Sequence, residues 1–196
     1  MDIGVVLRAA AAMPLSDAAR SFAQAGVPVF PCRRLGKEPR TEHGFHDASA
    51  ELRQVAAWWR RWPTANIGVP TGAVSGFEVV DVDVHPAGTG YVAFGRAQRE
   101  GLVDGWAALV RTPSGGLHAY YPASPDDPHR SWQAPAAHID FRGDGGYIVV
   151  PPSTVIGRAG KRSYTVVATA TSDGAPVDAR ALRELLDPRP EPVPWA

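Results

Sequence analysis

Residues that end helices and strands are spread along the whole chain, and this spread limits it to short regular elements. The sequence has 20 glycines and 19 prolines, 39 of 196 residues, which is above the common share of roughly 12%. Because both residues interrupt regular structure, we expect a loop-rich mixed fold. The hydrophobic share of 44% is ordinary for a globular protein and excludes wholesale disorder.

The charge balance and the single cysteine exclude several classes of protein. The 20 basic and 20 acidic residues cancel, so a basic coat for nucleic acid is absent and any DNA binding is expected to be weak and salt-sensitive. Cys32 has no second cysteine for a disulfide or a CxxC zinc site. The sequence has no apolar run long enough to span a membrane, and its first residues lack the basic region of a signal peptide. We therefore expect no membrane partner and a cytoplasmic location.

The order of the predicted elements favours an α+β fold built around a mostly antiparallel sheet. A short helix starts the chain, and Ser16 and Gly26 are suited to cap both ends of a second one. The Pro-Ser-Gly-Gly turn at 113–116 predicts a hairpin. The other expected helices are 49–61, 89–100 and 178–186. The expected strands are 27–31, 66–72 (a strand that ends in a turn), 77–84, 107–112, 117–121, 137–141, 146–150 and 163–168, and a proline-rich tail follows at 187–196.

The segment FEVVDVDV at 77–84 is the clearest candidate for a functional strand. Side chains alternate along a strand, so Asp81 and Asp83 share one face, about 7 Å apart, while Val80 and Val82 pack on the other. Two poorly solvated carboxylates repel each other unless a cation lies between them or they share a proton. The segment predicts a divalent-metal site, although an edge strand with a hydrated polar face fits it equally well.

The segment TPSGGLH at 112–118 combines groups that bind phosphates. Gly115 and Gly116 let the backbone approach a ligand and turn its N–H groups toward an anion. Ser114 adds a hydroxyl donor, and His118 can bond or pair with a phosphate. A plain hairpin turn with a surface histidine is the alternative.

A third segment, IDFRGDGG at 139–146, supplies another strand carboxylate. Ile139 and Phe141 point to one face and Asp140 to the other, so Asp140 is able to join Asp81 and Asp83. Arg142 lies on the same face as Asp140. It either holds a phosphate or neutralises Asp140 in a structural ion pair.

Other marked residues allow two interpretations each. Lys37 is one of only two lysines and either meets phosphates or is a solvated loop residue. His85 follows the acidic strand closely enough to reach a metal or a phosphate. The tryptophans at 58, 59 and 62 fit core packing better than base stacking.

The order of these three segments, Asp81-Val-Asp83, then Ser114-Gly-Gly-Leu-His118, then Ile139-Asp140, resembles motifs I to III of the archaeo-eukaryotic primase superfamily. More narrowly, residues 16–153 resemble the N-terminal domain of bifunctional DNA primase/polymerases (prim-pol), found in plasmid, phage and mobile-element replication proteins. This resemblance implies an α+β fold of two subdomains with a catalytic sheet related to the RNA-recognition fold. We expect a single domain over 1–196, with its core at about 16–170.

The resemblance also implies DNA primase/polymerase activity, a nucleotidyl transfer from dNTPs or NTPs to a primer 3′-hydroxyl on a DNA template. Asp81, Asp83 and Asp140 would be catalytic and would hold Mg²⁺ or Mn²⁺ in a two-metal site. The nucleotide would be bound by Ser114, Gly115, Gly116, His118, Arg142 and Lys37.

The chain departs from some relatives, and two rival functions remain open. It lacks the cysteines of a zinc-binding insertion, so we expect no zinc. The helical primase module and helicase that follow in many relatives are expected as separate partners, and primer extension is expected more firmly than de novo primer synthesis. A non-polymerising nucleoside-triphosphate-binding module and a metal-dependent phosphohydrolase or nuclease would use the same residues.

Overall fold

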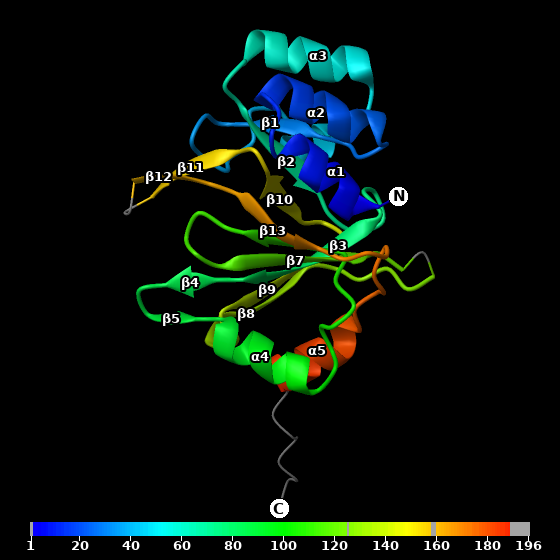
Figure 1. Ribbon diagram of the computed structural model, residues 1–196, viewed down its shortest axis with the longest axis vertical. Helices are drawn as coiled ribbons and strands as arrows, with labels where there is room; N and C mark the ends of the chain where they lie inside the picture. Colours follow the sequence, from blue (N-terminus) through cyan, green and yellow to red (C-terminus); the bar gives the residue numbers. More distant parts are fainter. Residues whose placement is uncertain (1, 125, 158–159, 189–196) are drawn as a thin grey trace, which may run out of the picture.

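In the computed structural model, which describes residues 2–124, 126–157 and 160–188, two antiparallel sheets are stacked between two groups of helices (Figure 1). The smaller sheet has the strand order β1-β2-β10, and the larger has the order β13-β6-β7-β3-β9-β8. This arrangement confirms the expected α+β class with a mostly antiparallel sheet. No helix in the described ranges is long and apolar enough to cross a membrane.

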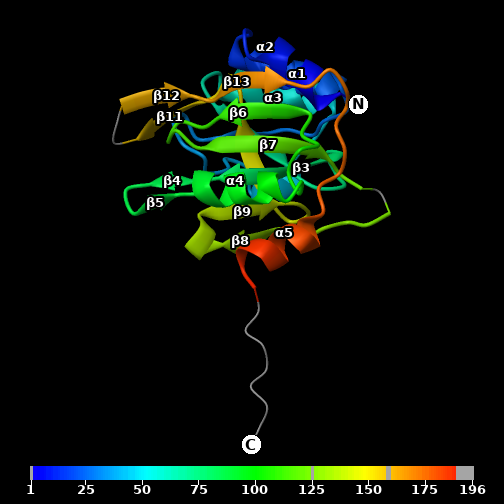
Figure 2. The ribbon, with the colours of Figure 1, turned by 60° about the horizontal axis from the view of Figure 1, so that its bottom comes forward.

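The described residues form five α-helices. Helices α2 and α3 cover the smaller sheet, α1 packs against α2 and against strands β6 and β13 of the larger sheet, and α4 and α5 cover the outer face of the larger sheet (Figures 1 and 2). Their bounds are α1 Ile3–Ala10, α2 Leu15–Gln24, α3 Leu52–Arg61, α4 Tyr91–Arg99 and α5 Ala179–Leu186, with short 3-10 helices η1 at Gly44–Asp47 and η2 at Pro135–Ala137.

The strands are short, as the spread of glycine and proline predicts. Two small hairpins, β4–β5 and β11–β12, extend on the same side of the molecule in both views (Figures 1 and 2). The bounds are β1 Phe30–Cys32, β2 Asn66–Pro70, β3 Phe77–Val82, β4 Val84–His85, β5 Gly88–Thr89, β6 Ala108–Arg111, β7 Leu117–Pro122, β8 Trp132–Ala134, β9 Ile139–Arg142, β10 Tyr147–Val150, β11 Thr154–Gly157, β12 Gly160–Ser163 and β13 Thr165–Thr169.

Three predicted helix starts are wrong. The helix expected over 89–100 begins at Tyr91, because Gly88–Thr89 form strand β5. Helix α2 begins at Leu15 after Pro14, whose carbonyl accepts the first helical bonds, so Ser16 lies inside the first turn. Helix α3 begins at Leu52 because the side chain of Glu51 accepts from two amides of its first turn, while Ser49 accepts from the Glu51 amide. Gly26 does end α2, with φ of 82°.

Several predicted strands have other limits. Val27 is not in a strand, because its amide closes the end of α2 on Phe22, and β1 starts only at Phe30. The strand expected over 77–84 ends at Val82, and Val84–His85 form the separate strand β4, which pairs with β5. The Asp83 amide makes the last bond of the β3–β9 pairing, to the carbonyl of His138. The sequence did not predict β8 or the β11–β12 hairpin. Of the proline-rich tail, residues 189–196 lie outside the described part.

Two apolar cores lie on opposite faces of the larger sheet. The first fills the space between the two sheets and reaches the N-terminal helices, with Phe22, Phe30 and Ile67 fully buried. The second lies between the sheet and helices α4 and α5, with Val80 and Phe141 fully buried. The six-stranded sheet is thus rigidly held from both sides, which fixes the side chains that leave its faces.

The tryptophans do not all pack as expected. Trp59 is buried in the first core and donates its indole N–H to the carbonyl of Ala65. Trp62 is half-buried, and the guanidinium groups of Arg40 and Arg61 lie over its ring, so it is a surface residue.

Candidate metal and nucleotide site

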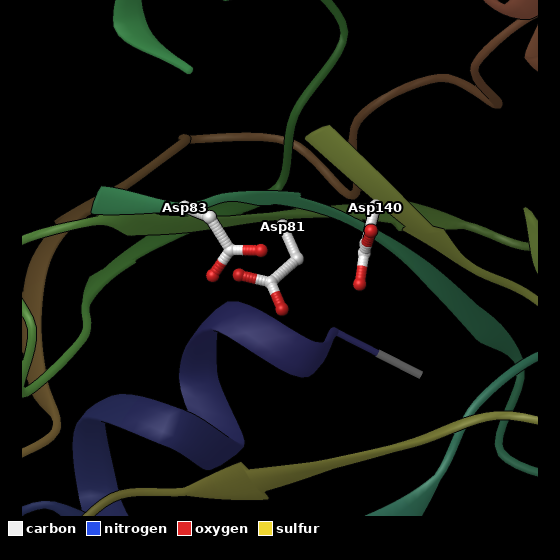
Figure 3. A group of neighbouring side chains, drawn as sticks. All are labelled: Asp81, Asp83 and Asp140. Atoms are coloured by element: carbon white, nitrogen blue, oxygen red, sulfur yellow. The ribbon is translucent and has the colours of Figure 1, made fainter. Parts of the chain in front are cut away.

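Three aspartates meet on the face of the larger sheet that looks toward the smaller sheet. Asp81 lies on β3 directly opposite Asp140 on the antiparallel strand β9, and Asp83 follows two residues later on the same side. One carboxylate oxygen of each lies within 4.8 Å of those of the other two. Figure 3 shows the three side chains leaving neighbouring strands in the same direction. Strand pairing therefore brings together the carboxylates that the sequence singled out.

The surroundings raise the pKa values of two of these carboxyl groups. Burial raises the pKa of Asp81 to about 6, against the lowering effect of the Arg142 and Lys37 charges. Burial also raises the pKa of Asp83, and the negative charges of Asp81 and Asp140 raise it further. Three converging carboxylates that disfavour one another's charge are the donor set that Mg²⁺ or Mn²⁺ accepts. The residues present therefore fit a divalent metal.

Arg142 lies beside these carboxylates, as its position on β9 predicts. Its Nη2 is 2.5 Å from Oδ2 of Asp140 and 3.7 Å from Oδ2 of Asp81. The amide of Gln133, on the edge strand β8, donates to the same Asp140 oxygen at 3.0 Å. In the structure Arg142 therefore forms an ion pair with Asp140. This pair is one of the two roles considered for Arg142 from the sequence, and phosphate binding is the other.

His118 lies on β7 opposite Asp81 and is buried, so it is not the surface histidine of a plain hairpin turn. Its Nε2 is 3.4 Å from Oδ1 of Asp81, and its Nδ1 has no hydrogen-bond partner among the described residues. Burial lowers the pKa of His118 to about 3, helped by the positive charges of Lys37 and Arg142. The imidazole is therefore neutral near neutral pH, and it offers its surroundings a hydrogen-bonding group and not a cation.

Lys37 approaches the site from the loop that follows β1. The carbonyl of Lys37 accepts a 3.4 Å hydrogen bond from the Tyr147 hydroxyl, which ties this loop to β10. The lysine is among the residues around a cavity of about 170 Å³ at the aspartates, whose lining is Lys37, Asp81, His118, Arg142, Tyr147, Ile148, Val149 and Tyr164. Lys37 is thus an exposed loop residue that also lines the cavity, so both interpretations of it remain open.

The turn at 112–116 is close to the aspartates but does not line this cavity. A Cβ on Gly116 would lie 2.1 Å from the carbonyl oxygen of Val82, so only glycine fits against the end of β3. The Gly115 amide is used within the turn, on the carbonyl of Thr112, and the Thr112 and Ser114 hydroxyls are 3.0 Å apart. The hydroxyl of Tyr91 donates to the Gly115 carbonyl from the start of α4.

His85 lies at the tip of the β4–β5 hairpin, beside the acidic cluster. Its Nε2 is 3.9 Å from Oδ2 of Asp83, and more than half of its side chain is exposed. The ring of His138 is a neighbour, with centroids 5.9 Å apart. This hairpin forms one border of the site.

Sequence reasoning missed three residues at the site. Gln133, Tyr147 and Tyr164 come from β8, β10 and the residue before β13. The segments of Gln133 and Tyr164 carry no glycine-rich or acidic pattern, and Tyr147 follows such a pattern but is not part of it. Each of the three becomes part of the site only through pairing or stacking between distant strands. A sequence signal for them would need the sheet order.

A sheet that gathers three acidic side chains beside an arginine, a lysine and a neutral histidine defines a class of protein that acts on phosphate compounds with a divalent metal. Residues 19–187 match the family described as bifunctional DNA primase/polymerase, N-terminal. The chain belongs to this family, which implies an enzyme of the nucleotidyltransferase type with nucleotide and DNA substrates. No curated protein matches the chain.

Proposed function

We propose that this protein is a DNA primase/polymerase domain that transfers nucleotides from dNTPs or NTPs to a primer 3′-hydroxyl under the direction of a DNA template. The observation that carries the proposal is the meeting of Asp81, Asp83 and Asp140 within 4.8 Å, with Arg142 and Lys37 beside them. Membership of the prim-pol family supports the same reaction.

Asp81, Asp83 and Asp140 would hold Mg²⁺ or Mn²⁺. When bound, such ions lower the pKa of the attacking hydroxyl and neutralise the charge that builds on the phosphates. The carboxylates themselves must be ionised to do this. Burial disfavours the ionised forms of Asp81 and Asp83, and the positive charge of the ion would offset this effect.

The remaining residues would bind and orient the incoming triphosphate. Lys37 and Arg142 supply positive charge at the cavity, and the neutral His118 supplies a hydrogen bond without adding to that charge. Ser114 and the Gly115–Gly116 backbone would border the phosphates at the end of β3, where the Tyr91 hydroxyl fixes the turn. Holding both substrates in line is the main contribution a protein makes to such a transfer.

A primer-extension assay tests the proposal. A labelled primer–template is incubated with dNTPs or with NTPs and Mn²⁺, and the products are separated on a denaturing gel. Wild type is compared with Asp81→Ala and with Asp173→Asn, which removes an exposed carboxylate in a loop outside the site. We expect template-dependent extension by wild type and by Asp173→Asn, and none by a folded Asp81→Ala.

Other outcomes would support the rival functions. A shortened primer would indicate a nuclease. An unchanged primer, with a chain that is folded and binds nucleotide, would indicate a binding module that does not polymerise. Repeating the assay on a template without primer separates extension from de novo synthesis, and adding a helicase or a helical primase module tests for a partner.

A further inference from the structure

Arg142 lies where a cation would neutralise the carboxylates of Asp81 and Asp140. Its Nη2 is 2.5 Å from Asp140 Oδ2 and 3.7 Å from Asp81 Oδ2, so one guanidinium bridges strands β3 and β9. Lys37 lines the same cavity but makes no ion pair with a carboxylate among the described residues. Of these two cations, only Arg142 is in direct contact with the acidic cluster.

Carboxylate oxygens of Asp140 and Asp81 that could bind a metal already contact other side chains of the protein. Asp140 Oδ2 accepts from both Arg142 and Gln133, and Asp81 Oδ1 faces His118 Nε2 at 3.4 Å. A divalent ion binds carboxylate oxygens directly. It would compete with the guanidinium for Asp140, and two cations that share one carboxylate repel each other.

We propose that Arg142 occupies the cation position of this site in the nucleotide-free protein, and that a divalent ion displaces it from Asp140 and so frees the guanidinium for the incoming triphosphate. This inference rests on the proposed function of the site. As a consequence, metal and nucleotide bind cooperatively. The metal displaces the Arg142 guanidinium from Asp140, and the free guanidinium then attracts the phosphates of the nucleotide.

The position of Arg142 permits such a movement. It is the last residue of β9 and is followed by the glycine-rich segment 143–146, which leads to β10 in the other sheet. Its side chain is 29% exposed, whereas those of Asp140 and Asp81 are 11% and 13% exposed. It also lines the cavity with Lys37 and His118, and a guanidinium binds a phosphate with two parallel hydrogen bonds.

The test measures binding of Mn²⁺ alone, by electron paramagnetic resonance titration of the nucleotide-free protein. Loss of a group that only orients a metal ligand typically costs about 10–100-fold in metal affinity. Loss of a competing cation acts in the opposite direction, so we expect Arg142→Gln to bind Mn²⁺ roughly tenfold more tightly than wild type. Unchanged or weaker binding would overturn the inference, because Arg142 would then act only on phosphates or only hold Asp140 in place.

Two variants serve as controls. Lys37→Gln removes a cation from the same cavity without breaking a contact to the aspartates, and we expect a clearly smaller gain in Mn²⁺ affinity. An equal gain would show a general effect of charge and would also overturn displacement. Arg142→Lys keeps the charge, and we expect its affinity to lie between those of wild type and Arg142→Gln.

A second measurement does not depend on the folding of Arg142→Gln. The Nε–H resonance of Arg142 in wild type is identified by its absence in Arg142→Lys, and Mg²⁺ is then added. A shift of this resonance with Mg²⁺ supports displacement, and a resonance that does not respond at saturating Mg²⁺ overturns it.

Failure of this inference is distinguishable from failure of the proposed function. If wild type binds no Mn²⁺ and extends no primer, the proposed function fails. The displacement alone is wrong if three results occur together. Wild type then binds Mn²⁺ and extends the primer, Asp140→Asn no longer binds Mn²⁺, and Arg142→Gln binds Mn²⁺ no more tightly than wild type.

Discussion

Strand β3 carries one acid–histidine pair on each of its faces, and the two pairs differ in what surrounds them. Glu78 is buried, and both of its carboxylate oxygens are 3.2 Å from Nδ1 of His129. Asp81, on the other face, lies 3.4 Å from His118. The His129 ring packs edge-on against Phe141 of the second core, so this pair belongs to the face covered by α4 and α5.

The difference separates a structural pair from a functional cluster. Burial raises the pKa of Glu78, and the hydrogen bonds and charge of its partner His129 act in the opposite direction. Asp81 lies beside two more carboxylates, two cations and a cavity. A lone buried carboxylate needs only one partner, whereas three together leave negative charge that an external cation can neutralise. The same two residue types thus serve opposite purposes on one strand.

Substitutions on the two faces of β3 are expected to differ most in their effect on primer-extension activity. Asp81→Asn removes one of the three carboxylates that we propose hold the metal, and it should reduce primer extension about 1,000-fold, equivalent to roughly 4 kcal/mol in the barrier. Glu78→Gln, its counterpart on the other face, should keep extension within about tenfold of wild type at a temperature where it is folded. Single-turnover extension rates check both. Equal losses would show that the Glu78 pair also takes part in catalysis.

For stability, the substitution at Glu78 is expected to have the larger effect and the substitution at Asp81 the smaller one. Glu78→Ala leaves His129 beside an empty buried position and should lower the free energy of unfolding by about 3 kcal/mol, as breaking a buried pair does. Asp81→Asn relieves the repulsion among the aspartates and should not lower it in metal-free buffer. Urea unfolding followed by circular dichroism measures both. A loss in Asp81→Asn as large as that in Glu78→Ala would contradict the division of the two faces.

The pH dependence of stability separates the members of the Asp81–His118 pair. Burial raises the pKa of Asp81 to about 6, so the folded state holds that proton more tightly and stability falls as pH rises from about 4 to 6. Burial lowers the pKa of His118 to about 3, so its contribution rises with pH between about 3 and 6.5. The two contributions oppose each other, and wild type should show only a shallow net change from this pair.

Removing either member exposes the other contribution. In EDTA, the free energy of unfolding of Asp81→Asn should rise between pH 4 and 6.5, and that of His118→Gln should fall over the same range, each by about 3 kcal/mol relative to wild type. Urea titrations at half-unit pH steps provide the profiles. Parallel profiles for wild type and both variants would mean that the pair titrates as it does in the unfolded chain.

Sequence alone predicted the elements whose signals are local. The alternation of valine and aspartate gave β3 and the shared face of Asp81 and Asp83, and Gly26 and Gly101 both end helices with positive φ. The three acidic positions could be grouped because each lies on a strand with a clear apolar face. Their meeting within 4.8 Å then required only that β3 and β9 be neighbours.

Features that depend on sheet order could not be predicted. Strands β9 and β10 are close in sequence, yet they pair in different sheets because the glycine-rich segment between them crosses from one to the other. This crossing brings Tyr147 to the cavity. The Glu78–His129 pair was missed for a similar reason, since 51 residues separate its members and no periodic pattern marks either one.

The smallest effect is expected at the edge of the site, where Gln133 contacts Asp140. Its amide donates at 3.0 Å to the oxygen that Arg142 also holds, so Asp140 keeps one partner when Gln133 is lost. The side chain of Gln133 is exposed, and an exposed hydrogen bond is worth about 1 kcal/mol or less. Gln133→Ala should therefore reduce the extension rate only two- to fivefold.

The dependence of this small effect on the Mn²⁺ concentration tests whether Gln133 acts only by orienting Asp140. Steady-state extension over a range of Mn²⁺ concentrations would show whether the loss is recovered when the metal is raised, as expected if Gln133 only orients a metal-holding carboxylate. A loss of 100-fold that high Mn²⁺ does not recover would mean that Gln133 touches the substrates itself. The catalytic face of β3 would then extend to the edge strand β8, beyond the three aspartates.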